Sequence, residues 1–157
     1  ACDRLHPAGA IYFMMDEKDV QAALSHPSAM VGSDGLPFDT HPHPRLWGTF
    51  PRVLGHYVRE LKLFPLEDAV RRMTSLPAET FGLTARGALK PGYYADICIF
   101  DPETVIDTAD FANPISAAKG IELVLVNGEV AYGGSSVARG GKVLLRQELQ
   151  AEAKALA

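Results

Sequence analysis

Two ionisable side chains are candidates for chemistry, the carboxylate of Asp34 and the guanidinium of Arg45. Asp34 lies between Ser33 and Gly35, directly after the short apolar run 29–32, where the chain is expected to turn out of a sheet. Because α/β folds place their active sites at the carboxyl ends of parallel strands, Asp34 is a candidate catalytic residue. An aspartate between serine and glycine is also typical of an ordinary turn, and that alternative stays open.

Arg45 belongs to a segment, 36–49, that contains three prolines. Proline is excluded from helix interiors and central strands, so the segment is predicted to be a loop. Loops of this length inside compact domains are usually functional. A planar guanidinium can donate two parallel hydrogen bonds to a carboxylate, which makes Arg45 a candidate substrate-binding residue. A solvated arginine or a local salt bridge is the alternative.

Histidine and cysteine residues offer a weaker case for a metal. His41 and His43 are separated by one proline, and two imidazoles at this spacing can share an ion, although spacing alone does not make the rings converge. Cys2 and Cys98 match no zinc spacing and are predicted to be free thiols. Cys98 lies in an apolar run and is expected in the core.

Serine catalysis and phosphate binding find no support. The residues around Ser33 do not form a G-x-S-x-G elbow, and no partnered histidine can be assigned. The glycine pairs at 133–134 and 140–141 follow a hairpin and do not open a helix, so they are predicted to be β connections.

An α/β segment is expected to position these residues. Short strands are predicted at 12–15 and 29–32, joined by a helix that Asp16 caps and that runs to about Leu24. Pro51 suits a first helical position, and helical apolar spacing continues to Phe64 and again over 66–73. Pro77 should interrupt the helix before one more turn ends at a glycine.

The last third of the chain is predicted to be β. A turn at 89–92 precedes a strand at 97–100, and Asn127-Gly128 joins strands at 122–126 and 129–132 as a hairpin. The boundary between the two segments falls at 82–91, no internal repeat is visible, and 146–157 is expected to be a helix or a frayed end.

Composition excludes several classes of function. The chain has 157 residues, 47% hydrophobic and 22% charged, as in an ordinary globular protein. A formal net charge of −4 and scattered Lys and Arg argue against a nucleic-acid partner. No apolar stretch is long enough to cross a bilayer and no signal peptide is visible, so a cytoplasmic location is expected.

Several motifs resemble the D-aminoacylases, that is, the N-acyl-D-amino-acid deacylases of the amidohydrolase superfamily. The similarity covers about 10–143, and its later pieces, from Gly87 to Gly128, are shared with many amidohydrolases. The run Gly48-Thr49-Phe50-Pro51 is more specific to the deacylases. The motifs also include Ile11-Tyr12-Phe13-Met14-Met15, Gly32-Ser33-Asp34-Gly35 and His43-Pro44-Arg45-Leu46-Trp47.

The resemblance implies an α/β fold, the C-terminal part of a (β/α)8 TIM barrel followed by strands of a small β-sandwich. Residues 1–84 would be terminal βα units of the barrel, 85–146 the β-sandwich segment and 147–157 a tail. Residues 30–33 would be the last barrel strand. Asp34 would be the general base, and a possible metal ligand, in zinc-dependent hydrolysis of N-acyl-D-amino acids to a carboxylate and a D-amino acid. Arg45 would grip the substrate carboxylate.

The zinc ligands that the resemblance implies are a cysteine and histidines from earlier barrel strands, and a complete barrel needs roughly 250 residues. We therefore expect those ligands upstream of Ala1 and expect this chain alone to be inactive, with exposed barrel edges that could drive self-association. The rival hypothesis is a non-enzymatic α/β binding or assembly module that retains amidohydrolase motifs.

Overall fold

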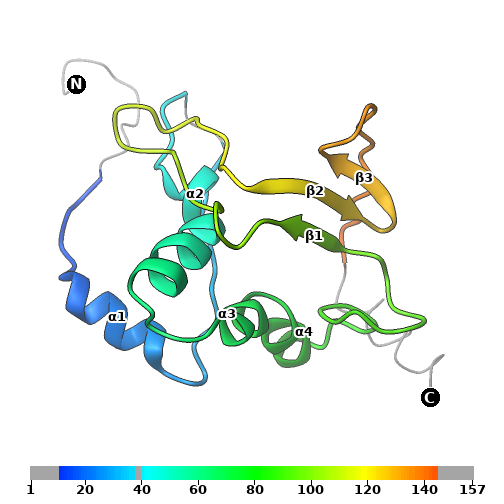
Figure 1. The fold of residues 1–157 in the computed structure, drawn as a ribbon, viewed down its shortest axis with the longest axis horizontal. Coiled ribbons are helices and arrows are strands. Elements are labelled where there is room, and N and C mark those ends of the chain that lie inside the picture. Colours follow the sequence, from blue (N-terminus) through cyan, green and yellow to red (C-terminus); the bar gives the residue numbers. More distant parts are fainter. Residues whose placement is uncertain (1–10, 38–39, 145–157) are drawn as a thin grey trace, which may run out of the picture.

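Five helical segments and one small sheet make up the part of the chain, residues 11–37 and 40–144, that the computed structural model describes. A separate helix, α1 (Glu17–Ser25), precedes a helical group with a three-stranded sheet beside it (Figure 1). The helical group comprises α2 (Arg45–Arg52), the π-helix η1 (Val53–Glu60), α3 (Leu66–Met73) and α4 (Ser75–Phe81). The sheet comprises β1 (Ile97–Phe100), β2 (Ile121–Val126) and β3 (Glu129–Tyr132).

Helix α1 begins as the sequence predicts. Asp16 is extended at the N-cap, and its side chain accepts a hydrogen bond from the N–H of Lys18 at 2.8 Å. Acidic residues at 17 and 19 lie in the first turn, where they complement the helix dipole. The helix ends at Ser25, one residue beyond the expected end.

The two predicted parallel strands are absent. Residues 12–15 form no strand, and their side chains are 74–83% exposed instead of buried. Residues 29–32 are also outside any strand, and the N–H of Val31 bonds to the carbonyl of Arg72 on α3 at 3.2 Å. A strand is stable only when neighbouring strands pair with it, and the described residues supply no such neighbour to either segment.

The prediction of a loop over 36–49 is wrong from Arg45 onward, where α2 begins. The helix begins directly after Pro44, whose helical φ of −52° and ψ of −26° prepare the first turn. Pro51, expected at a first helical position, lies inside α2. Four residues of η1 after it are buried, and this packing outweighs the roughly 3 kcal/mol that an interior proline costs.

The second helical pair follows the sequence more closely. Helix α3 spans the predicted residues, but the chain breaks at Thr74, with φ −132° and ψ −86°, and not at Pro77. Pro77 lies in the first turn of α4, where a backbone N–H would have no partner within the helix, so proline costs no hydrogen bond there. The helix ends at Gly82, whose φ of +70° is the left-handed conformation predicted for a terminal glycine.

The sheet is antiparallel in the order β1-β2-β3. Asn127 and Gly128 join β2 to β3 with φ values of +52° and +84°, which confirms the predicted hairpin and its two-residue turn. Cys98 on β1 is exposed and not part of the core, because the space between β1 and the helices remains open beside it. The predicted tail at 146–157 and Cys2 lie outside the described residues.

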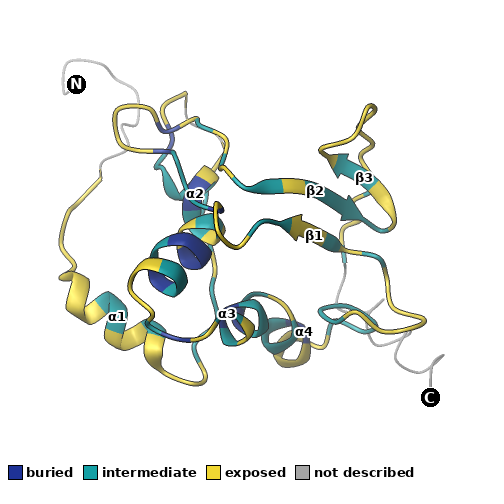
Figure 2. Ribbon diagram, viewed as in Figure 1, coloured by how far each residue is buried: buried dark blue, intermediate teal, exposed yellow. Residues whose placement is uncertain are grey.

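The buried residues centre on η1 and on the residues that pack against it (Figure 2). Among the described residues, Arg72 is the charged residue that is buried, 3% exposed, and its ion pair with Asp68 measures 2.7 Å. The same guanidinium donates to the carbonyls of Leu24 and His26 at 2.8 and 2.5 Å, so it ties the end of α1 to α3. The buried cluster consists of Val53, Leu54, Tyr57, Phe64, Ala69 and Val105.

None of the helices among the described residues combines the length and the apolar character needed to span a bilayer.

Candidate functional site

The structure brings Asp34 and Arg45 together. Nη2 of Arg45 lies 2.7 Å from Oδ2 of Asp34, and Nε of Arg45 donates to the Asp34 carbonyl oxygen at 2.9 Å. The Asp34 side chain is 79% exposed and that of Arg45 is 38% exposed. Both groups are therefore paired and still open to a ligand from solvent.

A tight turn presents Asp34. Its φ of +48° is left-handed, which aspartate tolerates better than most residues. Ser33 supports the turn, because its Oγ accepts the N–H of Gly35 at 3.3 Å. A Cβ on Gly35 would lie 2.8 Å from Cδ1 and 2.9 Å from Cα of Leu46, so only glycine lets the turn approach the start of α2 this closely.

Arg45 is the first residue of α2, and both of its main-chain polar groups are held by side chains. Its N–H donates to Nδ1 of His43 at 3.0 Å, and its carbonyl accepts from Oγ1 of Thr49 at 2.8 Å. Burial lowers the pKa of His43, and the neighbouring positive charge of Arg45 lowers it further, against the opposing effect of Asp34.

A pocket opens beside the pair, between one face of α2 and the segment 107–111. Positions 45, 48, 49 and 52 lie on one helical face, and this face lines the pocket. A Cβ on Gly48 would lie 3.0 Å from Cβ of Asp107, so the glycine lets the two walls approach. Arg52 closes one end through an ion pair with Asp107 at 3.3 Å. The facing wall consists of Asp107, Ala109, Asp110 and Phe111.

The facing wall was not predicted from the sequence. Residues 107–111 carry no motif, and their separation from Arg45 along the chain gives no sign that they approach α2. The only local feature that a sequence pattern could have indicated is a turn at Asp110, whose side chain accepts the N–H groups of Ala112 and Asn113.

His41 and His43 bind protein groups and do not act as a pair. Nε2 of His41 is hydrogen-bonded to the carbonyl oxygen of Phe111 at 3.0 Å, whereas Nδ1 of His43 accepts from Arg45. Within residues 11–37 and 40–144, no group of three or more His, Cys, Asp and Glu side chains could hold a metal ion. A zinc site requires at least three protein ligands, so the described residues do not form one by themselves.

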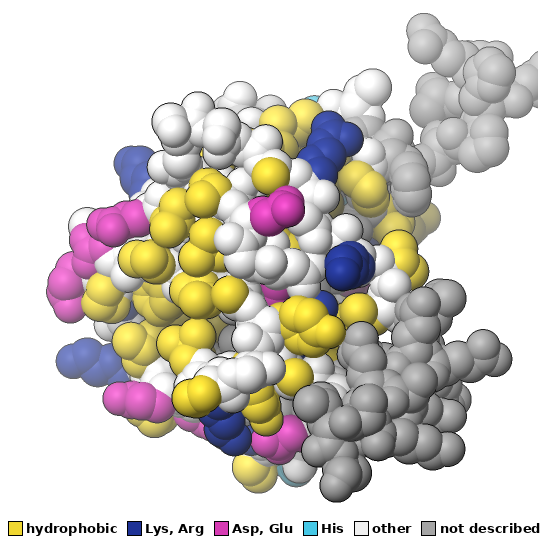
Figure 3. Space-filling model, turned by 90° about the vertical axis from the view of Figure 1, so that its right-hand side faces the viewer, with side chains coloured by type: hydrophobic (Ala, Val, Ile, Leu, Met, Phe, Trp, Pro, Cys, Tyr) yellow, Lys and Arg dark blue, Asp and Glu magenta, His cyan; other side chains and the backbone are white. Residues whose placement is uncertain are grey.

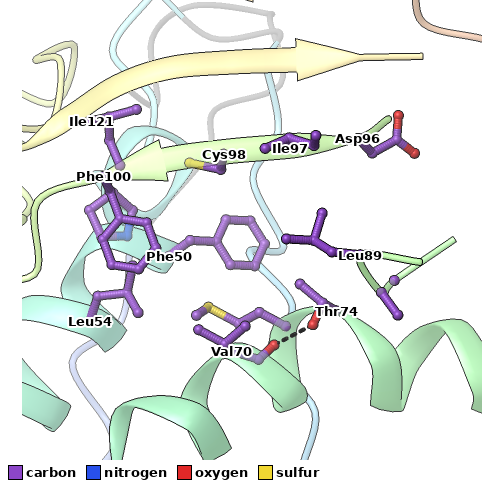
Figure 4. Close-up of a pocket in the computed structure, with 14 residues that line it drawn as sticks. Phe50, Leu54, Val70, Thr74, Leu89, Asp96, Ile97, Cys98, Phe100 and Ile121 are labelled. Atoms are coloured by element: carbon purple, nitrogen blue, oxygen red, sulfur yellow. Dashed lines mark hydrogen bonds between the residues drawn. The ribbon is translucent and has the colours of Figure 1, made fainter. Parts of the chain in front are cut away.

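A second hollow lies between β1 and the helices and is apolar (Figure 4). Phe50, Leu54 and Val70 line it from the helical side, with Cys98 and Phe100 on the strand. Figure 3 shows hydrophobic side chains gathered over one face of the molecule. The side chains that line the hollow are mostly apolar, and its carboxylate, that of Asp96, is engaged in an ion pair with Arg86. The Asp34–Arg45 pair therefore remains the candidate site.

Comparisons with known proteins agree on one family. The profile described as "Amidohydrolase family" matches residues 2–132. D-aminoacylase of Alcaligenes xylosoxydans xylosoxydans is 59% identical over 147 residues, which cover 90% of this chain and 30% of that protein. This chain thus spans about 30% of the length of that curated relative.

Two solved structures share the fold of this segment. A crystal structure of a D-aminoacylase is 61% identical, with a TM-score of 0.81 over 85% of this chain and 28% of that one. The N-acyl-D-glutamate deacylase of Bordetella bronchiseptica, complexed with zinc and a phosphonate inhibitor, is 58% identical, with a TM-score of 0.80 over 83% of this chain and 27% of that one. Because the family profile spans most of its residues, the chain belongs to the amidohydrolase family.

Proposed function

We propose that the full-length protein containing this segment hydrolyses the amide bond of N-acyl-D-amino acids to a carboxylate and a D-amino acid. The single observation that carries the proposal is the pairing of Asp34 with Arg45 at 2.7 Å beside an open pocket. High identity to a D-aminoacylase and to an N-acyl-D-glutamate deacylase supports the substrate class.

Asp34 is the proposed general base. Hydrolysis needs a group that takes a proton from the attacking water and gives it to the leaving amine nitrogen, and a positioned carboxylate can do both. The exposure of Asp34 supports this role, because a water molecule and a substrate can reach its free oxygen.

Arg45 is the proposed ligand for the substrate carboxylate. A guanidinium has five N–H donors, and Asp34 occupies two of them, on Nε and Nη2. The other three, two on Nη1 and one on Nη2, include a parallel pair at the end of the group that suits a second carboxylate. Arg45 can therefore bind Asp34 and an N-acyl-D-amino acid at the same time.

Zinc is part of the proposal, although residues 11–37 and 40–144 do not form its site by themselves. Zinc would be held mainly by residues outside the described segment, with Asp34 as a possible further ligand, and it would lower the pKa of a bound water molecule. The zinc in the related deacylase of Bordetella bronchiseptica supports this requirement.

We propose the domain arrangement implied by the resemblance, with 1–84 completing a (β/α)8 barrel and 85–146 contributing to a β-sandwich. The exposed apolar side chains at 12–15 support it, because barrel units that lack their neighbours leave such faces uncovered. When the segment is produced alone, self-association through these faces is expected. The proposed location is the cytoplasm.

The test is stereospecific hydrolysis by the purified full-length protein. N-Acetyl-D-methionine should release acetate and D-methionine, the L-enantiomer should not, and chelation of zinc should abolish the release until zinc is restored. A full-length protein that is folded and loaded with zinc, yet hydrolyses no N-acyl-D-amino acid, would refute the proposal and favour a non-enzymatic binding or assembly module.

A further inference from the structure

His43 provides the side chain that starts α2 at the candidate site. Its carbonyl oxygen accepts the N–H of Leu46 at 3.0 Å, and its Nδ1 accepts the N–H of Arg45 at 3.0 Å. The first N–H groups of a helix have no partner within the helix, so a side-chain acceptor at this position stabilises the start. An accepting ring nitrogen carries no proton, and the neutral ring must therefore hold its proton on Nε2.

The opposite side of the site fixes the ring of His43. Phe111 packs edge-to-face against it with 5.2 Å between ring centroids. Phe111 is itself held by Phe13, at a centroid distance of 4.9 Å, and by His41 through its carbonyl oxygen. The segment that forms the far wall of the pocket thus sets the orientation of His43.

This arrangement fixes the main-chain position from which the Arg45 side chain extends. His43 holds the N–H of Arg45 and Thr49 holds its carbonyl, so the main chain of residue 45 is constrained on both sides. From this fixed point the guanidinium reaches both the carbonyl and the carboxylate of Asp34. A small rotation at Arg45 would separate the two contacts, because the fork of a guanidinium is planar and rigid.

We propose that His43, as the Nε2–H tautomer, is a positioning residue that aligns Arg45 for simultaneous contact with Asp34 and the substrate carboxylate. The inference rests on the proposed function for its substrate and adds a residue and a tautomer to it. His43 touches neither the substrate nor Asp34 in this role and acts through the main chain of Arg45.

Three variants of the full-length protein separate positioning from packing. His43→Asn keeps an acceptor where Nδ1 lies and should hydrolyse N-acetyl-D-methionine with a KM within about threefold of the unaltered protein. His43→Phe keeps the aromatic contact with Phe111 but loses the acceptor, and its KM should rise roughly tenfold with a smaller change in kcat. His56→Gln is the control, because His56 lies on η1, pairs with Glu60 and does not line the pocket, so its KM should be unchanged.

The pattern of KM values decides between the two roles. Rescue by asparagine together with loss in phenylalanine supports positioning. Equal KM values for His43→Phe and the unaltered protein, or equal impairment of His43→Asn and His43→Phe at unchanged thermal unfolding midpoints, would overturn it.

Nitrogen-15 NMR of histidine-labelled full-length protein tests the contact without any turnover, with His43 assigned from the spectrum of His43→Asn. The proton should lie on Nε2, and a proton on Nδ1 would overturn the inference even if His43→Phe failed to fold. The NMR result also stands if the protein hydrolyses no N-acyl-D-amino acid, an outcome that would refute the proposed function alone.

Discussion

Arg45 holds Asp34 with one edge of its guanidinium, Nε on the carbonyl oxygen at 2.9 Å and Nη2 on the carboxylate at 2.7 Å. One side chain thereby fixes both the left-handed turn at Asp34 and the direction of its carboxylate. The opposite end of the guanidinium remains available to a ligand.

Replacing Arg45 by lysine should weaken both contacts. A lysine ammonium cannot reproduce a planar fork, so the Arg45→Lys variant of the full-length protein should bind N-acyl-D-amino acids roughly 10- to 100-fold less tightly. Steady-state kinetics with N-acetyl-D-methionine would measure the rise in KM. Arg71→Lys, on α3 and paired with Asp68, is the matched control and should leave KM unchanged. An unchanged KM in Arg45→Lys would contradict the proposed carboxylate contact.

Gly35→Ala should disturb the site by overpacking. The new Cβ would lie 2.8 Å from Cδ1 and 2.9 Å from Cα of Leu46, and we expect a loss of about 2 kcal/mol in the free energy of unfolding together with reduced kcat. Urea denaturation and turnover of the full-length protein measure the two effects. Adding Leu46→Ala removes the side-chain clash but leaves the contact with Cα, so the double variant should recover part of both losses. No recovery would show that the close approach at Gly35 does not limit the site.

Protonation of Asp68 should make the protein less stable in acid. Hydrogen bonds from Arg72, and then from Arg71, hold the pKa of Asp68 below its usual value of 3.8, although partial burial opposes them. The unfolded chain therefore binds the proton first as the pH falls below 3.8. The stabilisation is complete above that pH and is lost as the pH falls through the pKa of the folded state.

Urea midpoints between pH 6 and pH 3 can test this sign. The unaltered protein should lose more stability over this range than Asp68→Asn, which is less stable at pH 6 but has no carboxylate to protonate. Glu67→Gln, in the same turn of α3, leaves the Asp68 ion pairs in place and should keep the full acid dependence. Parallel curves for Asp68→Asn and the unaltered protein would contradict the assignment.

Local signals in the sequence predicted the elements whose stability is local. The cap at Asp16, the left-handed end at Gly82 and the Asn127-Gly128 hairpin each depend on a few neighbouring residues, and all three are confirmed. The turn at Asp34 was also predictable from the sequence, and the structure adds that Arg45 forms an ion pair with it. The catalytic and binding roles of the two residues stay predictions.

The predictions that failed depended on distant partners. Residues 12–15 and 29–32 have the composition of strands but lack strand neighbours among the described residues, so they stay irregular. Pro51 was expected to begin a helix and instead lies within one, because burial of η1 outweighs the local cost. The contact between α2 and Asp107 had no sequence signal at all, since it depends on the path of the chain between them.

The turnover number of the Asp34→Asn variant of the full-length, zinc-loaded protein with N-acetyl-D-methionine tests directly whether Asp34 is the general base. Asparagine preserves the size of the side chain and tolerates the left-handed backbone but cannot accept the proton. When the two proteins are compared at equal zinc occupancy, we predict a fall in kcat of roughly 100- to 10,000-fold. A kcat within tenfold of the unaltered protein would contradict the claim that Asp34 is the general base.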